Sequence, residues 1–197
     1  MKNKKWGVQN INEQKGKTII ITGATSGLGK EATRVLAKKN ATVIMAVRNT
    51  QKAEMVVSEI RKEYANVKID IRDLDLGSLD SISSFAKGVL EDYKKLDILI
   101  NNAGIMMCPY SKTKNGFEIQ MGTNHLGPFA LTGLLMPLLL NTKNARIVST
   151  SSVAHNQGNI DFTDINWEKR KYDTSKAYSD SKLANLYFSY ELNRKIE

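Results

Sequence analysis

The chain has 197 residues, of which 41% are hydrophobic and 25% are charged. This is the length of one ordinary domain with a near-average globular composition, which disfavours long disordered segments and a second domain. We therefore expect a single domain over residues 1–197. The formal charge of +9 comes from scattered Lys and Arg residues with no aromatic interleaving, an arrangement that argues against a nucleic-acid partner.

Membrane insertion and secretion are also disfavoured. The longest apolar stretch, residues 130–140, is about half of what a bilayer requires and contains Pro137, so we expect a buried helix there. Residues 1–5 are basic, but no apolar run follows them as it would in a secretory signal. Cys108 is the only cysteine, which excludes an internal disulfide and fits a reducing compartment. The expected location is cytoplasmic.

Short apolar runs alternate with longer segments of helical periodicity along the chain. This alternation predicts an α/β fold, a Rossmann-type doubly wound parallel sheet flanked by helices. The expected strands, each rich in Ile, Val or Leu as a strand buried on both faces should be, are residues 18–22, 41–47, 67–71, 96–101 and 145–149. The expected helices are residues 30–38, 51–64, 79–93, 117–140 and 177–197.

Helix boundaries can be predicted at a few positions. Thr50 and Ser78 are the expected N-caps of the second and third helices, because short hydroxyl side chains satisfy free N–H groups there. Pro128 and Pro137 fall within the fourth helical segment, which we expect to be interrupted or to begin after Pro128.

A glycine-rich turn, Thr22–Gly29, follows the first expected strand and opens the first expected helix. Its glycines are spaced Gly-x-x-x-Gly-x-Gly. Glycines permit a tight turn and close backbone approach to a pyrophosphate, and the helix N-terminus offers unpaired N–H groups. A plain strand-to-helix turn is the alternative. The expected cofactor contacts in this turn are Gly23, Thr25, Ser26, Gly27, Leu28 and Gly29.

The end of the second expected strand indicates which dinucleotide binds. An acidic residue commonly grips the adenosine ribose at this point, but here Val47 is followed by Arg48. A guanidinium can pair with a 2′-phosphate that a carboxylate would repel. NADP(H) is therefore favoured over NAD(H), with Arg48 and Asn49 as contacts; the alternative is that Arg48 is a solvated loop residue.

Polar or small residues follow the third and fourth expected strands as well. Asp75 could accept a hydrogen bond from an adenine amino group, with Leu76 beside it, although acids are common at helix starts for electrostatic reasons. Asn102, Ala103 and Gly104 follow the fourth strand, where small residues let a cofactor pass and amides can tie strands together. An ordinary polar turn is the alternative there.

Tyr178 and Lys182 lie four residues apart and therefore project from one face of the last expected helix. A cation held beside a phenol stabilises the phenolate, so Tyr178 is the expected general acid and base for a carbonyl/alcohol reaction. On an isolated helix both would be packing or surface residues, but their place downstream of a nucleotide-binding sheet favours catalysis. His125 and His155 lack partners at metal-ligand spacing, and no metal is expected.

Taken together, these segments resemble the short-chain dehydrogenases/reductases. The resemblance rests on Thr22–Gly29, Asn101–Gly104, Asn124, the pair Ser151-Ser152 and Tyr178-x-x-x-Lys182. Residues 6–16, 124–127, 151–155 and 181–185 are similar more particularly to the retinol-dehydrogenase-like branch.

What the resemblance implies is an NADP(H)-dependent oxidoreductase that interconverts an alcohol with an aldehyde or ketone. It implies that Ser152 holds the carbonyl oxygen, that Asn124 orders a water in the proton relay, and that Lys182 also binds the nicotinamide ribose. The expected partner is a small-molecule alcohol or carbonyl compound, without nucleic acid or a membrane span; a homodimer is left open.

Two departures from the family pattern have consequences. Family members continue with further strands, so we expect the C-terminal strands to be missing, the chain to be a piece of a longer protein, and one sheet edge to be exposed. The stretch between Ser152 and Tyr178 is longer than in compact members and is expected to form a loop over the active site that carries selectivity.

Two alternative functions are open. One is a noncatalytic NADP-binding regulatory protein, and the other is a basic nucleic-acid-binding protein.

Overall fold

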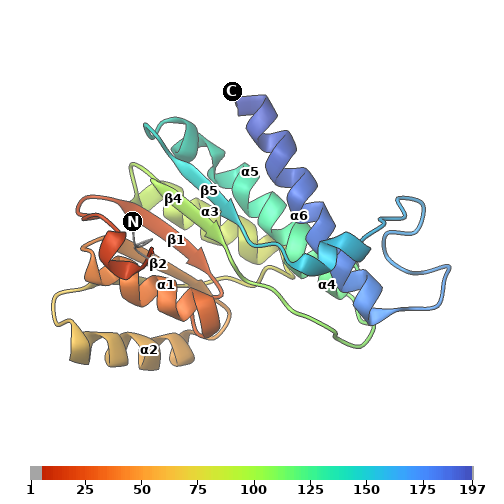
Figure 1. The fold of residues 1–197 in the computed structure, drawn as a ribbon, viewed down its shortest axis with the longest axis horizontal. Helices are drawn as coiled ribbons and strands as arrows, with labels where there is room; N and C mark the ends of the chain where they lie inside the picture. Colours follow the sequence, from red (N-terminus) through yellow and green to blue (C-terminus); the bar gives the residue numbers. More distant parts are fainter. Residues whose placement is uncertain (1–5, 197) are drawn as a thin grey trace, which may run out of the picture.

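The computed structural model describes residues 6–196 and is built around a five-stranded parallel sheet in the order β3-β2-β1-β4-β5 (Figure 1). The strands are β1 Thr18–Thr22, β2 Thr42–Val47, β3 Lys68–Asp73, β4 Ile98–Asn101 and β5 Arg146–Ser149. Parallel strands alternating with helices confirm the Rossmann-type fold. The basic residues 1–5 and the last residue of the final expected helix, 197, lie outside the described part.

Helices cover both faces of the sheet. The long helices are α1 Gly27–Lys38, α2 Thr50–Glu63, α3 Leu79–Asp92, α5 Gly127–Leu140 and α6 Thr174–Ile196. The short ones are η1 Val8–Asn10, α4 Ile119–Met121, the π-helical turn η2 Gly122–Leu126 and η3 Val153–Gln157. None of the helices within residues 6–196 has the length and apolar character needed to cross a membrane.

The core is divided into two layers by the sheet, because successive strand side chains point to opposite faces. Ile19 of β1 packs in a cluster with Ile60 of α2, whereas the next residue, Ile20, packs in a second cluster with Phe85 of α3 and Leu135 of α5. The central strands β1 and β2 are almost wholly buried, as predicted.

The two edge strands do not match that prediction. Residues of β3 and β5 are partly buried or exposed, and Val148 of β5 is 46% exposed. The expectation that every strand is buried on both faces is wrong for these two, because each has a neighbouring strand on one side only in the described residues.

The helix starts show which caps the sequence analysis identified. Ser78 is the N-cap of α3, since its side chain accepts from Ser81 N, as predicted. Thr50 is not the N-cap of α2: Asn49 is, and its Oδ1 accepts from Lys52 N at 2.8 Å. Helix α6 begins earlier than expected, since Asp173 Oδ1 accepts from the first amides of the helix.

The fourth expected helix is interrupted, as the prolines suggested. Residues of α4, the π-helical turn η2 and α5 follow one another without a loop. Pro128 lies in the first turn of α5, directly after the π-helical turn, and Pro137 lies inside α5. A proline inside a helical run removes one backbone hydrogen bond, which fits the change from α-helix to π-helix before Pro128.

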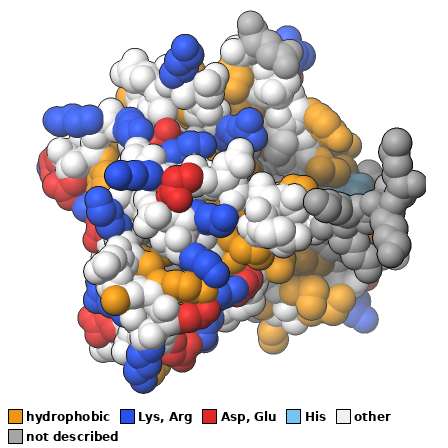
Figure 2. All heavy atoms as spheres, turned by 60° about the vertical axis from the view of Figure 1, so that its left-hand side comes forward, with side chains coloured by type: hydrophobic (Ala, Val, Ile, Leu, Met, Phe, Trp, Pro, Cys, Tyr) orange, Lys and Arg blue, Asp and Glu red, His pale blue; other side chains and the backbone are white. Residues whose placement is uncertain are grey.

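The charged surface is mixed. On the face shown in Figure 2, Lys and Arg side chains are interspersed with Asp, Glu and uncharged residues, without a continuous basic stripe. Ion pairs join α1 and α2, such as Lys30 with Glu59 and Arg34 with Glu63. Exposed pairs of this kind add little stability, and the face in Figure 2 does not resemble the basic stripe of a nucleic-acid-binding protein.

Strand order reverses between β1 and β4, the two neighbours from which the chain continues in opposite directions across the sheet. Ligands of open α/β sheets bind at the carboxyl ends of strands at such a switch point. The segments after β1 and β4 are the glycine-rich turn and Asn102–Gly104, so the fold brings the two predicted cofactor motifs together.

Candidate active site

The glycine-rich turn packs against the segment that follows β4. Gly23 has a φ of +67°, and a Cβ on it would lie 2.8 Å from Cα of Ala103, so a larger residue does not fit. Gly27 also has a positive φ, but its Cβ position faces open space. The turn is thus closed at Ala103 and open at Gly27, where a phosphate can approach the backbone at the start of α1.

Hydrogen bonds between the two strand ends fix this junction. Thr22 Oγ1 accepts from Asn102 N at 3.0 Å and from Ala103 N at 2.9 Å. The Asn102 amide donates to Thr22 O at 2.9 Å. The expectation that amides here tie neighbouring strands together is confirmed.

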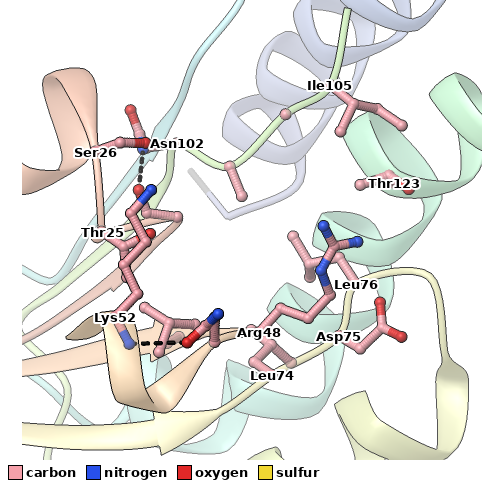
Figure 3. A pocket seen from close by; sticks show the side chains of 16 residues that line it. Thr25, Ser26, Arg48, Lys52, Leu74, Asp75, Leu76, Asn102, Ile105 and Thr123 are labelled. Atoms are coloured by element: carbon pink, nitrogen blue, oxygen red, sulfur yellow. Dashed lines mark hydrogen bonds between the residues drawn. The ribbon is translucent and has the colours of Figure 1, made fainter. Parts of the chain in front are cut away.

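A cavity of about 470 Å³ opens at this junction (Figure 3). Ten predicted cofactor residues line it: Gly23, Thr25, Ser26, Arg48, Asn49, Asp75, Leu76, Asn102, Ala103 and Gly104. Gly27, Leu28 and Gly29 belong to the same turn but are not among the lining residues, and Leu28 is 76% exposed.

Six further lining residues were not predicted as cofactor contacts: Ala46, Val47, Lys52, Leu74, Ile105 and Thr123. Lys52 could have been identified from the sequence. A cation in the first turn of a helix is electrostatically unfavourable, so a Lys at this position suggests contact with an anionic ligand. Ile105 and Thr123 have no such signal in the sequence.

Arg48 and Lys52 give the cavity a positive wall. Arg48 follows β2 directly and Lys52 comes from the first turn of α2, and Figure 3 shows both side chains along the cavity. Neither side chain takes part in an ion pair with another residue of the described range. Both charges are therefore available to an anionic ligand.

Asp75 lines the same cavity, but its carboxylate already has partners. Oδ1 accepts from Gly77 N at 2.9 Å, and Oδ2 forms an ion pair of 3.3 Å with Lys114. The adenine contact assigned to Asp75 stays a prediction, and an adenine amino group would share this carboxylate with Lys114, whose side chain is 71% exposed.

Helix α6 presents Tyr178 and Lys182 on one face, next to the end of the cavity. Lys182 Nζ lies 5.6 Å from the centroid of the Tyr178 ring and donates to Thr150 O at 3.2 Å. A Cβ on Gly104 would lie 3.4 Å from this nitrogen. Lys182 is 4% exposed, and burial lowers the pKa of its amine below the usual value. The cavity lined by Gly104 therefore adjoins the predicted catalytic pair.

The hydroxyl groups of Ser151 and Ser152 have different partners. Ser151 Oγ donates to the backbone carbonyl of Lys182 at 2.8 Å. Ser152 Oγ accepts from Ala154 N at the start of η3. Since the Ser151 hydrogen is used to hold α6, this arrangement favours Ser152 as the residue that can donate to a substrate.

Asn124 lies in the π-helical turn and is 1% exposed. Its amide nitrogen donates to Ile105 O at 2.9 Å and to Ser181 Oγ at 3.0 Å, and its oxygen accepts from Ile105 N at 2.8 Å. The side chain clamps the segment after β4 to α6. Its role in ordering a relay water stays a prediction.

The two histidines have non-metal partners. His125 Nδ1 lies 3.1 Å from Asn185 Oδ1, and burial lowers the pKa of this imidazole. His155 Nδ1 lies 2.6 Å from Ser152 O. Within residues 6–196 there is no group of three or more His, Cys, Asp or Glu side chains that could hold a metal ion.

Comparison with known proteins agrees with this geometry. Residues 17–196 match the family described as short chain dehydrogenase. A human protein named retinol dehydrogenase 12 is 50% identical over 192 residues, which cover 97% of this chain and 60% of the relative. A solved structure from Mycobacterium paratuberculosis superposes with a TM-score of 0.85 at 45% identity, covering 97% of this chain and 66% of that one.

The chain therefore belongs to the short-chain dehydrogenase family and is similar to its retinol dehydrogenases. It spans 55% to 60% of the length of curated relatives such as human retinol dehydrogenases 13 and 12. A further solved relative, a short chain dehydrogenase of Escherichia coli CFT073 in complex with NADPH, has a TM-score of 0.75 at 29% identity and covers 94% of this chain and 74% of that one.

Proposed function

We propose that the protein is an NADP(H)-dependent oxidoreductase that interconverts an alcohol with an aldehyde or ketone. The observation that carries this proposal is the buried Lys182 amine, which lies beside the Tyr178 ring and against Gly104 at the end of the nucleotide cavity. Burying an amine is costly, so its retention next to a phenol at a sheet switch point supports a chemical role.

The cavity fits a phosphorylated dinucleotide. Gly23 permits the close packing of the turn against Ala103, and the open position at Gly27 leaves room for a pyrophosphate at the start of α1. Arg48 and Lys52 would meet a 2′-phosphate, which NADP(H) has and NAD(H) lacks. The relative solved with NADPH supports the same choice.

The residues of this chain account for the proton chemistry. When bound, the nicotinamide supplies or accepts the hydride at the carbonyl carbon. Tyr178 donates its hydroxyl proton to the carbonyl oxygen during reduction and takes the alcohol proton during oxidation. Lys182 stabilises the resulting phenolate and holds the nicotinamide ribose, and Ser152 donates a hydrogen bond to the substrate oxygen. Asn124 supports the proton relay.

The substrate is proposed at the level of a class, an aldehyde or ketone and its alcohol. Because relatives carry the name retinol dehydrogenase, retinaldehyde belongs in the panel of candidates. A cytoplasmic location and a homodimer are part of the proposal; the single cysteine fits a reducing compartment, and the exposed aromatic side chains of Phe129 and Tyr187 on α5 and α6 fit a subunit contact.

The test is a titration of the purified protein with NADPH and NADH, followed by a turnover screen of aldehydes and ketones, retinaldehyde included, with the tighter cofactor. The variant Tyr178→Phe should lose at least about 100-fold in turnover, as expected when a general acid is removed, with cofactor affinity nearly unchanged. Tyr190→Phe, an exposed tyrosine on the same helix, is the matched control and should behave as wild type.

Two outcomes would count against the proposal. Full turnover by Tyr178→Phe would remove the assignment of the acid and base. NADPH binding without turnover of any carbonyl compound would instead support a noncatalytic NADP-binding regulatory protein.

A further inference from the structure

Two buried polar side chains just before and within α4, Glu118 and Gln120, make hydrogen bonds that the proposed reaction does not use. Both are 0% exposed. Burying such groups is unfavourable unless each finds partners, so their contacts indicate what they hold in place.

Glu118 is a carboxylate held by hydrogen bonds. It accepts from Gln120 N at 2.9 Å, from Met121 N at 2.6 Å and from the Tyr172 hydroxyl at 2.8 Å. No Lys or Arg within residues 6–196 forms an ion pair with it. Burial, together with the bond and charge of Glu118, raises the pKa of Tyr172 to about 12, so the phenol remains a proton donor to the carboxylate.

Gln120 uses both ends of its amide to join separate segments. Its Nε2 donates to the Tyr172 hydroxyl and to Thr174 O, both at 2.9 Å. Its Oε1 accepts from Met107 N at 2.9 Å. Thr174 Oγ1 in turn donates to Cys108 O at 2.8 Å. One amide therefore connects the segment after β4 with the first residue of α6.

These bonds converge at the start of the helix that carries the catalytic pair. Thr174 is the first residue of α6, and Tyr178 follows about one turn later. The segment through Met107 begins at Gly104, which lies against Lys182. The network therefore fixes the phenol relative to the wall of the cavity, across segments more than fifty residues apart in the chain.

We propose that Glu118 and Gln120 are positioning residues that aim Tyr178 at the substrate by anchoring the first turn of α6. The inference rests on the proposed function, since the aim of Tyr178 matters only if it transfers a proton. A displacement of about 1 Å at a reacting group can cost on the order of 100-fold in rate, so loosening this anchor acts on turnover more than on binding.

The variant that tests the anchor with the least disturbance is Tyr172→Phe, which removes one hydroxyl shared by Glu118 and Gln120. Its kcat should fall about tenfold or more, with KM for NADPH unchanged and the pH profile of kcat displaced. Hydrogen exchange at the amides of residues 177–180 should become faster, a measurement that does not depend on activity. A role in packing alone would lower Tm without separating kcat from KM.

A second pair of variants covers the case in which Tyr172→Phe does not fold. Thr174→Val removes the hydroxyl that donates to Cys108 O, whereas Thr174→Ser keeps it. We expect Thr174→Val to reproduce the loss in kcat and Thr174→Ser to restore it. Lys112→Met is the matched control, because it breaks an exposed ion pair between the segment after β4 and Glu168, which lies before α6. It should match wild type in every measurement.

The outcomes separate this inference from the proposed function. If Tyr178→Phe is inactive while Tyr172→Phe and Thr174→Val keep wild-type kcat, pH profile and exchange, the positioning role is refuted and the proposed function stands. If Tyr178→Phe is fully active, the proposed function fails, and the exchange measurement alone decides whether the network anchors α6.

Discussion

The nucleotide half and the catalytic half of the cleft are held in shape by different kinds of contacts. In the nucleotide half, backbone geometry and one hydroxyl group set the shape: Gly23 and Gly27 have positive φ angles, and the backbone amides of Asn102 and Ala103 donate to Thr22 Oγ1. In the catalytic half, buried side chains dominate: Asn124 clamps Ile105 to α6, and Gln120 joins the segment after β4 to the start of that helix.

The two halves also differ in how much of each is local in the chain. The bend of the nucleotide half is a turn of eight consecutive residues, although Thr22 ties it to Asn102, 80 residues away. The catalytic half has no such local motif, and Glu118 and Tyr172 lie 54 residues apart. A local feature can form from its own sequence preferences. The catalytic half depends on the assembled fold, so substitutions in its network should disturb function over a longer range than substitutions at the nucleotide turn.

The largest expected effect falls on the catalytic half, at Lys182. Lys182→Met should lower turnover at least about 100-fold, in the range that acid–base groups contribute, without lowering Tm. Thr150 O, which accepts from Lys182, keeps a second donor in Asn185 Nδ2 at 3.2 Å, so no carbonyl is orphaned. Turnover assays and thermal unfolding of the same preparation check this.

The pH dependence of stability sharpens the Lys182 prediction. Burial lowers the pKa of the folded amine from its ordinary value of 10.5, so between the two pKa values the unfolded chain binds more protons than the folded one, and lowering the pH favours unfolding. The penalty is complete below the folded pKa and absent above 10.5. The Tm of Lys182→Met minus that of wild type should therefore be larger at pH 7 than near pH 10. If this difference were the same at both pH values, or larger near pH 10, the cost assigned to burying the charged amine would be contradicted.

The next effect tests the backbone basis of the nucleotide half. Gly23→Ala should destabilise the fold by about 2 kcal/mol, because a Cβ costs about 1–2 kcal/mol in the left-handed region and would lie 2.8 Å from the Ala103 Cα. This corresponds to a Tm lower by about 4–8 °C for a domain of this size. NADPH binding should weaken as the turn shifts.

Gly133→Ala provides a control of opposite sign. Gly133 lies inside α5, and nothing lies within 4 Å of its Cβ position. Alanine there should stabilise the helix by about 0.5–1 kcal/mol. If both substitutions lowered Tm alike, the special geometry of Gly23 would not be the cause.

The same division explains what the sequence could and could not predict. The central strands, the Ser78 cap and ten of the residues lining the cavity follow from apolar runs, short-range capping and motif spacing. The N-cap of α2 lies one residue before the predicted Thr50. Asn and Thr are both N-cap residue types, with Asn the stronger, and the fold shows that the Asn49 side chain accepts from the helix amide of Lys52. The partners of Glu118 and Gln120 could not be predicted, because a buried polar residue looks like a surface residue until the distant segment that satisfies it is placed.

The smallest effect concerns the positive wall of the cavity, where a side chain rather than the backbone sets selectivity in the nucleotide half. Arg48→Gln should weaken NADPH binding by about tenfold or more, since a hydrogen bond to a charged group contributes about 1.5–3 kcal/mol and about 1.4 kcal/mol is tenfold in affinity. Affinity for NADH should change little. Fluorescence titrations with both cofactors at the same ionic strength measure the two constants.

Arg61→Gln is the control for this prediction, because Arg61 lies in α2 outside the cavity and its loss changes the net charge by the same amount. The general attraction of an anion to a chain of net charge +9 acts on both cofactors, so Arg61→Gln should leave their affinity ratio unchanged. Equal losses for NADPH and NADH in Arg48→Gln would place this guanidinium on the part that the two cofactors share. Selectivity would then have to come from Lys52, the other cation of the same wall.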